Sequence, residues 1–338
     1  MAVCCIKRLM LQHYSKARRL LFIGLVAGFA LFVSFAVYVY QGELKTQLWK
    51  PALDAALEKV HLRRVSNQNV SSTTQDDSPH PMPFNVTDPL SGYVNVLKDR
   101  KPLKMHCSVC AMVSSSGQVL HHEAGTEIDK AECVIRMNDA PVTGFEKHVG
   151  TRTTIRVASH TSFQLVNKKR ADLLVKNKGL TLVAWGPDKS MKTDGKGRIF
   201  NGLSKLAKDI GNDIDVYMLT PERMAYADKV FEIETGKPRQ SSGTFLSTGW
   251  FTMILATEMC DEIKVYGMIS DDFCETSNAK PVLYHYYGAS KLQECHMYRA
   301  MEKQKKGGHR FITEKKVFER WTKKHDITFH FPTWEPKV

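Results

Sequence analysis

The sequence predicts an α/β domain in which helices flank a largely parallel sheet, and this domain is expected at residues 101–338. Three observations predict it. Short apolar runs typical of buried strands alternate with helical patterns, the first runs end in small polar residues, and 43% of the chain is hydrophobic, which is enough to bury a core. No internal repeat is visible in the sequence.

The chain begins with a basic segment followed by an uncharged one. Residues 1–19 hold five Lys or Arg and no acid, and residues 20–40 hold no charged group. At about 1.5 Å per residue, the second segment spans a bilayer core of about 30 Å. A cleaved signal peptide is the alternative, but its apolar core would be shorter, and here the run ends in Tyr38 and Tyr40, which suit a membrane interface. We therefore predict a cytoplasmic tail at 1–19 and a type II signal anchor at 20–40.

Residues 41–100 have the composition of a luminal stem. The part from Asn67 to Pro89 is rich in Ser, Thr, Asp, Asn and Pro and has few large apolar groups, so it cannot bury enough surface to offset its ordering entropy. Both Asn-x-Ser/Thr sequons lie here, at Asn69 and Asn85. They are predicted N-glycosylation sites, although such sequons also occur by chance.

Three apolar runs open the predicted domain, and polar residues follow each of them. Ala111 to Val113 precedes Ser114-Ser115-Ser116-Gly117, Cys133 to Met137 precedes Asn138-Asp139-Ala140-Pro141, and Thr153 to Ala158 precedes Ser159-His160. Small hydroxyl residues and glycine let the backbone approach a ligand and leave N–H and O–H groups for an anion. An ordinary serine-rich turn is the alternative for the first run. Because carboxyl ends of parallel strands share one edge, the pattern predicts a ligand crevice there.

The alternation continues towards the carboxyl end. Further strands are expected at Thr181 to Trp185, Val216 to Leu219 and Ile263 to Tyr266, and the clearest helix is expected at Trp250 to Cys260. The segment Leu246-Ser247-Thr248-Gly249 precedes that helix. A Ser-Thr-Gly sequence at a helix start offers capping hydroxyls, free N–H groups and a partial positive charge, which suit a phosphate or a carboxylate. A plain N-cap is the alternative.

Two histidines are candidates for proton transfer. His285 lies among tyrosines in Tyr284-His285-Tyr286-Tyr287, and His309 follows Gly307-Gly308 and precedes a helix expected at Thr313 to Lys323. Imidazole titrates near neutral pH, so it can take a proton from a hydroxyl without being permanently charged. A packed structural histidine is the alternative for both.

Metal and nucleic acid are not expected ligands. Asp213-Ile-Asp215 has the spacing of a metal-binding pair, but it precedes a strand, whereas a metal site belongs at a strand's end, so a solvated turn is the prediction. Cys107-x-x-Cys110 with Cys133 has no second matching pair for zinc, and an oxidising lumen favours disulfides, with fifteen full pairings open for the six luminal cysteines. The chain has a net charge of +13, and without the five basic residues of the first 40 positions the luminal part has 43 basic and 35 acidic groups, a net charge of +8. This charge suits anionic substrates but is also ordinary for a solvated surface. A luminal chain without a recognised binding motif has no expected nucleic-acid partner.

Four segments in order resemble the sialylmotifs of animal sialyltransferases. They are Cys107 to Val157 for the long motif, Ser242 to Gly267 for the short motif, Tyr284 to Tyr287 for the third motif and His309 to Glu314 for the His-x4-Glu motif. The resemblance covers the chain from about residue 90 to its end. Within this family the chain resembles the α-N-acetylgalactosaminide α-2,6-sialyltransferases of types III to VI, through RMNDAP (136–141), WGP (185–187), ETGK (234–237), LSTGWFTM (246–253), YHYY (284–287) and HRFITEK (309–315).

The resemblance implies roles for particular residues. It makes His309 the catalytic base, places His285 near the donor phosphate, and gives Glu314 an orienting role without proton transfer. It pairs Cys110 with Cys260 and Cys274 with Cys295, which leaves Cys107 with Cys133. The residues expected to bind the donor CMP-sialic acid are Ser115, Asn138, Ser159, Ser247, Thr248 and Gly249.

The resemblance also implies a fold, a reaction and a compartment. The expected domain is a single variant GT-A-like, Rossmann-type fold anchored in the Golgi membrane. The expected reaction is inverting transfer of sialic acid to the 6-hydroxyl of GalNAc in sialyl-α2,3-Gal-β1,3-GalNAc acceptors of O-glycoproteins or gangliosides, with no metal or other cofactor. The alternatives are a sialyltransferase of α2,3 or α2,8 linkage and a non-catalytic luminal glycan-binding relative. The acceptor surface is expected in the loops Met191 to Asn201 and Asp271 to Pro281.

Overall fold

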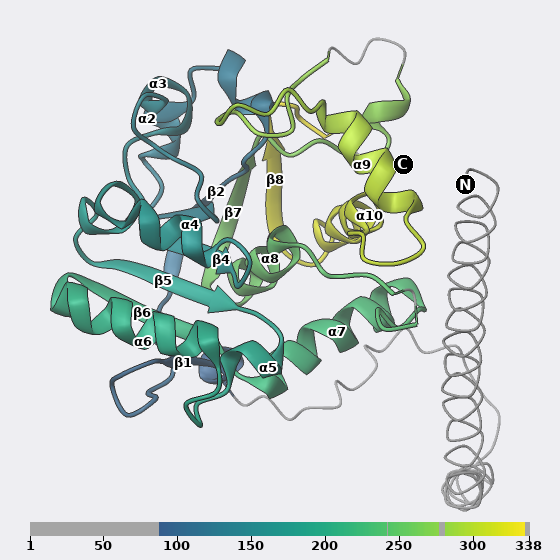
Figure 1. Cartoon of the computed structure of the whole chain (residues 1–338). Coiled ribbons are helices and arrows are strands. Elements are labelled where there is room, and N and C mark those ends of the chain that lie inside the picture. The colour runs from purple at the N-terminus through teal and green to yellow at the C-terminus, as the bar shows by residue number, and fades with distance from the viewer. Residues whose placement is uncertain (1–87, 242, 277–280, 335–338) are drawn as a thin grey trace, which may run out of the picture. The chain divides into compact units, whose positions relative to one another are not determined.

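The structure is a computed structural model, and it describes residues 88–241, 243–276 and 281–334 (Figure 1). The predicted tail, anchor, both sequons and most of the predicted stem therefore lie outside the described residues. Within the described part of the chain, no helix has the length and apolar character needed to cross a bilayer.

An eight-stranded sheet forms the centre of the domain, in the order β1-β6-β5-β4-β3-β2-β7-β8 (Figure 1). All neighbouring strands are parallel except β1 and β6, which are antiparallel. The predicted α/β class with a largely parallel sheet is thus confirmed. The strands are β1 Tyr93–Asn95, β2 Cys107–Val113, β3 Cys133–Met137, β4 Ile155–Ser159, β5 Leu180–Trp185, β6 Ile214–Leu219, β7 Cys260–Tyr266 and β8 Asp326–His330.

Helices cover both faces of this sheet. The α-helices are α2 Gly125–Ile128, α3 Glu146–Val149, α4 Phe163–Lys168, α5 Asp188–Met191, α6 Arg198–Ile210, α7 Pro221–Thr235, α8 Thr248–Met259, α9 Glu294–Lys303 and α10 Phe311–Trp321. Short turns of other helical types are η1 Pro89–Gly92, η2 Gly117–His121, η3 Ala171–Val175, η4 Gly211–Asp213 and η5 Phe273–Glu275.

Alternation along each strand divides the core between the two faces. In β5, Leu182 and Ala184 pack with α4 and α6, whereas Val183 and Trp185 pack with the cluster that contains α7, α8 and α10. This period of two places successive side chains on opposite faces of a sheet that is buried on both sides. Helix α8 is buried nearly all round and contacts β3, β4 and β7, so its first turn lies near the carboxyl ends of the central strands.

The folded domain begins earlier than the predicted boundary at residue 101. Tyr93, Val94 and Asn95 pair with Leu219, Met218 and Tyr217, and Tyr93 is only 2% exposed. This correction concerns a strand of three residues, which is too short to show the period of two from which strands are recognised in a sequence. The predicted strand at Cys133 to Met137 has the observed bounds, and the other predicted strands are observed with ends shifted by a few residues.

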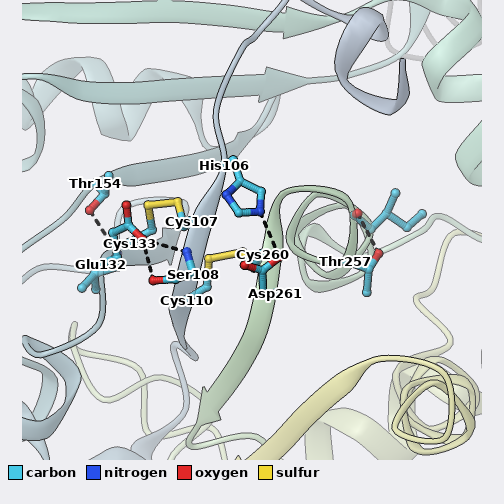
Figure 2. Close-up of a disulfide and its surroundings, with 12 residues drawn as sticks. His106, Cys107, Ser108, Cys110, Glu132, Cys133, Thr154, Thr257, Cys260 and Asp261 are labelled. Atoms are coloured by element: carbon cyan, nitrogen blue, oxygen red, sulfur yellow. Dashed lines mark hydrogen bonds and ion pairs between the residues drawn. A yellow bond between two sulfur atoms is a disulfide. The ribbon is translucent and has the colours of Figure 1, made fainter. Parts of the chain in front are cut away.

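Three disulfides join the six cysteines of the domain. They are Cys107–Cys133, Cys110–Cys260 and Cys274–Cys295, which confirms the predicted pairs and the pairing that remained. Figure 2 shows the first two beside each other on β2, close to a 2.9 Å contact between His106 Nε2 and Asp261 Oδ1. They tie β2 to its two neighbours in the sheet, β3 and β7.

Candidate functional site

A cavity of about 660 Å³ lies at the carboxyl ends of the central strands. The segments that follow β2, β3, β4, β5 and β7 all contribute to its wall, together with the start of α8 and residues of α7, α9 and α10. This is where a doubly wound sheet places its ligand. The predicted donor-binding and catalytic residues all line it: Ser115, Asn138, Ser159, Ser247, Thr248, Gly249, His285 and His309.

All three serines of the turn after β2 line the cavity, but they differ in exposure. The Ser114 hydroxyl accepts a hydrogen bond from Ser116 N (2.9 Å), and the Ser116 hydroxyl accepts one from Gln118 N (3.0 Å), which caps η2. Ser114 and Ser116 are buried, whereas Ser115 is half-buried. The outer serines thus hold the turn, and Ser115 has the exposure that a ligand contact needs.

Asn138 connects the ends of β3 and β4 with the start of α8. Its backbone has a φ of 49°, in the left-handed region that Asn adopts more readily than most residues. Its Oδ1 accepts a hydrogen bond from Ser159 N (3.0 Å), and its Nδ2 lies 3.4 Å from Thr248 Oγ1. Beneath it, the buried Arg156 guanidinium donates to the Asn138 carbonyl (2.8 Å). The turn is therefore fixed from three directions.

The start of α8 is capped by Ser247, and Ser247 is itself held by Glu314. The Ser247 hydroxyl accepts a hydrogen bond from Trp250 N (3.1 Å) and donates to Glu314 Oε2, while Ser247 N donates to Glu314 Oε1 (2.9 Å). Glu314 is 2% exposed, and this burial raises the pKa of its carboxyl to about 7. Glu314 therefore holds the residue that caps α8.

His285 lies in an aromatic stack. Its ring is 4.4 Å from the ring of Tyr284 and 5.1 Å from that of Tyr287, measured between centroids, and both pairs are stacked. Burial lowers the pKa of His285, partly offset by the carboxylate of Asp139. Asp139 in turn accepts a hydrogen bond from the Tyr287 hydroxyl (3.1 Å). His285 is therefore neutral at neutral pH and can donate one N–H to a ligand.

His309 has one ring nitrogen fixed by the backbone. Its Nδ1 lies 2.8 Å from the carbonyl oxygen of Phe245. A carbonyl can only accept a hydrogen bond, so Nδ1 carries the proton and Nε2 carries the lone pair. Burial lowers the pKa of His309, with a smaller opposite effect of the Phe245 carbonyl, which favours the neutral base. The Phe245 N–H donates to Gly308 O (3.0 Å), so Phe245 forms hydrogen bonds both to His309 and to the residue before it.

The cavity wall also contains residues for which the sequence predicted no role in the site. Among them are His160, Trp185, Asp228, Arg239 and Lys315. Asp228 and Arg239 form a bidentate ion pair with N–O distances of 2.5 and 2.7 Å. No described residue of the loops at 191–201 and 271–281 lines the cavity, although those loops were the expected acceptor surface. The sequence does not identify such residues as part of the site, because residues of these types are common in helices and turns and only the folded structure brings them to the cavity.

The two motifs that were weighed as metal sites lie away from the cavity. Cys107, Cys110 and Cys133 come within 4.8 Å of one another, but each is bonded in a disulfide and offers no thiolate. Asp215 lies near the amino end of β6, where its carboxylate pairs with Lys98 at 2.5 Å. Asp213 belongs to the short turn η4, whereas Asp215 is part of β6, so the predicted turn is correct for Asp213 and wrong for Asp215.

Comparison with known proteins identifies related sequences and structures. The family model of glycosyltransferase family 29 (sialyltransferase) matches residues 65–325. The chain is 47% identical to alpha-N-acetylgalactosaminide alpha-2,6-sialyltransferase 3 of Rattus norvegicus over 258 residues, which are 75% of this chain and 83% of that protein. It is 49% identical over 245 residues to a Homo sapiens protein named alpha-N-acetyl-neuraminyl-2,3-beta-galactosyl-1,3-N-acetyl-galactosaminide alpha-2,6-sialyltransferase, covering 72% of this chain and 80% of that one. A crystal structure of a mammalian sialyltransferase aligns with a TM-score of 0.42 and 20% identity, over 66% of this chain and 68% of the other.

Proposed function

This chain belongs to glycosyltransferase family 29, the sialyltransferases, and from this membership we propose that it transfers sialic acid from CMP-sialic acid to the 6-hydroxyl of GalNAc. The proposed acceptor is sialyl-α2,3-Gal-β1,3-GalNAc on O-glycoproteins or gangliosides. The relatives at 47% and 49% identity are named alpha-2,6-sialyltransferases, and this supports the proposed linkage.

One observation carries the proposal most directly. A histidine with an unprotonated Nε2, His309, lines the same cavity as the Ser-Thr-Gly start of α8 and the strand-end residue Asn138. The first group can remove a proton from a sugar hydroxyl, and the others offer hydrogen bonds and a partial positive charge to an anionic donor. A group-transfer reaction between a hydroxyl and a nucleotide sugar needs both.

The proposed mechanism is a single inverting displacement. His309 Nε2 takes the proton of the acceptor 6-hydroxyl as its oxygen forms a bond to the anomeric carbon of sialic acid. The bond from that carbon to the phosphate oxygen breaks, and CMP leaves with the electron pair. The N–H groups at the start of α8 and the N–H of His285 receive the negative charge on the phosphate. Ser115, Asn138 and Ser159 hold the nucleotide.

Membership in the family also supports proposals about the compartment, the fold variant and the metal requirement. We place the domain in the Golgi lumen, on a single-pass type II anchor at residues 20–40, and we assign it the variant GT-A-like form of the α/β fold. CMP carries one phosphate, so the helix dipole and His285 can balance its charge, and no added metal is expected to be needed.

The test is a transfer assay with the full chain, CMP-sialic acid and a chelator. The α2,3-sialylated Gal-GalNAc trisaccharide is offered on a peptide and on a ganglioside, and the linkage of the product is analysed. Transfer to the GalNAc 6-position of either acceptor supports the proposal. Products linked α2,3 or α2,8 would replace it with the alternative linkage, and no product from any sialylable acceptor would favour a non-catalytic relative.

A further inference from the structure

Lys315 is a buried lysine in the wall of the cavity. It lies on α10 and is 4% exposed, whereas the side chain of its neighbour Lys316 is 59% exposed. Its Nζ lies 4.1 Å from the centroid of the Tyr298 ring and 5.9 Å from that of Phe311, and both rings line the same cavity. The ammonium group is thus packed against aromatic faces at the boundary of the candidate site.

Lys315 makes no hydrogen bond or ion pair within the described ranges 88–241, 243–276 and 281–334. The neighbouring carboxylates of Glu314 and Glu294 form no ion pair with it. Both carboxylate oxygens of Glu314 bind Ser247. Glu294 Oε2 accepts a hydrogen bond from Gln118 Nε2 (3.1 Å), and Glu294 Oε1 is buried without a hydrogen-bond partner among the described residues, so it does not bind Lys315 either. Burial lowers the pKa of Lys315, and surrounding carboxylates oppose this from a longer range; they are Glu294, Glu314, Glu302 and Asp271.

A buried ammonium without a close partner is unfavourable unless another anion completes its environment. Surface lysines avoid this by extending into water, as Lys316 does. Because Lys315 lines the cavity, the missing partner can be supplied by a bound substrate. The proposed substrates offer two kinds of oxyanion, the phosphate of the nucleotide and the carboxylate of a sialic acid.

The position of Lys315 favours the carboxylate. The phosphate already has proposed partners in the N–H groups at the start of α8 and the N–H of His285, whereas no residue is assigned to the carboxylate. Lys315 lies on α10, the helix that follows His309, and packs on α9 through Tyr298. We propose that Lys315 is a binding residue for the carboxylate of a sialic acid unit. This inference rests on the proposed function. The carboxylate belongs either to the sialic acid of the donor or to the terminal sialic acid of the acceptor, and the experiment separates these two sources.

The experiment compares three variants of the full chain with the wild type. Lys315→Met removes the charge and keeps the length, Lys315→Arg keeps the charge, and Lys316→Met is the matched exposed control. In the acceptor arm, KM is measured for the sialylated trisaccharide as the free acid and as its methyl ester. In the donor arm, binding of CMP-sialic acid is compared with binding of CMP by calorimetry, and thermal unfolding is recorded for every variant.

The expected result is a loss of binding affinity that is seen only with substrates that carry a free carboxylate. A charge-assisted hydrogen bond contributes enough that its removal weakens binding by about 10- to 100-fold. Lys315→Met should therefore raise KM for the free acid but not for the ester, or weaken CMP-sialic acid but not CMP. Lys315→Arg should lose less in the same arm, and Lys316→Met should match the wild type.

Two results would overturn the inference. One is an unchanged KM and unchanged donor binding in Lys315→Met with a lower unfolding temperature, which would make Lys315 a structural counter-charge for Glu294 and Glu314. The other needs no variant and covers the case in which Lys315→Met does not fold. It is a wild type that has the same KM for the free-acid and the methyl-ester acceptor and binds CMP-sialic acid and its methyl ester equally well. Failure of the proposed function is separate, because wild type would then transfer to no acceptor while ligand binding still reports on Lys315.

Discussion

The buried carboxylate of Glu314 accepts a 2.9 Å hydrogen bond from the backbone N–H of Ser247, which lies 67 positions earlier in the chain. Ser247 uses its hydroxyl to cap α8, so the helix start that faces the cavity is held by a side chain from α10. His309 lies just before α10, and its ring is bound to the backbone of Phe245, two residues before Ser247. Two contacts therefore set the distance between the proposed base and the proposed phosphate site.

The first prediction concerns the pH dependence of stability. Burial raises the pKa of Glu314 from 4.5 to about 7, so the folded state binds this proton more tightly than the unfolded state. The stabilisation is fully present below the unfolded pKa of 4.5 and is lost as pH rises through the folded pKa of about 7. Glu314→Gln should lack this dependence, so the unfolding temperature of the wild type relative to that of the variant should fall as pH rises.

Thermal unfolding between about pH 5 and pH 8 checks this. Glu222→Gln is the control, because Glu222 is exposed at the start of α7 and should give a curve parallel to that of the wild type. A constant difference between wild type and Glu314→Gln across the range would show that Glu314 stays ionised in the folded protein.

The second prediction concerns His309 as the base. His309→Ala should lower kcat by about 10²- to 10⁴-fold, the range for loss of general base catalysis, and leave CMP binding close to that of the wild type. Burial lowers the pKa of His309 below 6.5, so the wild-type rate should be flat at neutral pH and fall only on the acidic side of 6.5. Pre-steady-state or steady-state rates across this range, with CMP binding by calorimetry, are the measurements.

His121→Ala is a suitable control for that variant, because His121 is exposed and does not line the cavity. A His309→Ala enzyme with normal kcat would remove His309 from the mechanism. A variant that loses CMP binding together with turnover would instead assign His309 to the donor site.

The sequence predicts the position of the site better than its full wall. Asn138 and Ser159 are identified because polar residues directly after apolar strands must lie at one edge of a parallel sheet. Lys315 is not identified, because a lysine after Glu314 in a helical pattern is typical of a solvated face. Lys315 is buried where α10 packs against Tyr298 of α9. A local sequence pattern does not show that these two helices pack together.

The missed strands have a similar physical reason. Strand β1 has three residues, and β8, Asp326–His330, lies at the other edge of the sheet and alternates exposed and buried residues over only two repeats. Central strands such as Cys133 to Met137 are buried along their whole length and are recognised as continuous apolar runs. The signal of β1 is weak because the strand is short although it is buried, and that of β8 is weak because one of its faces is exposed.

The third prediction separates the two roles of Asn138, its backbone conformation and its amide. Asn138→Ala keeps a Cβ at a φ of 49° and loses the hydrogen bond to Ser159 N, whereas Asn138→Gly loses the same bond but adopts this φ readily. The alanine variant should thus be less stable than the glycine variant by about 1 kcal/mol. Both should weaken CMP binding to the same degree, because both lack the amide.

Chemical denaturation and calorimetry with CMP check the two parts independently. Equal stability of the alanine and glycine variants would mean that the turn relaxes away from the left-handed conformation. Wild-type CMP affinity in both variants would remove the Asn138 side chain from the donor site.

The fourth prediction concerns where the folded domain begins. Tyr93 is 2% exposed, its hydroxyl lies 3.3 Å from Arg223 Nη2, and the Arg223 guanidinium lies 4.9 Å from the centroid of its ring. Arg223 also pairs with the carboxylate of Glu258 on α8. A fragment that starts at Lys101 lacks β1. The ion pair between Arg223 and Glu258 then loses its contact with the Tyr93 ring, and β6 becomes an edge strand.

We expect a fragment of residues 101–338 to be less stable than one of residues 82–338. A buried tyrosine removes about 150–250 Å² from water at about 25 cal/mol per Å², so the loss of Tyr93 alone should lower the free energy of unfolding by about 4 to 6 kcal/mol. The exposed edge of β6 should also promote association between copies. Unfolding temperature and sedimentation of both fragments test this. Equal values would mean that β1 contributes no stability and that the domain can be cut at residue 101, as its composition suggests.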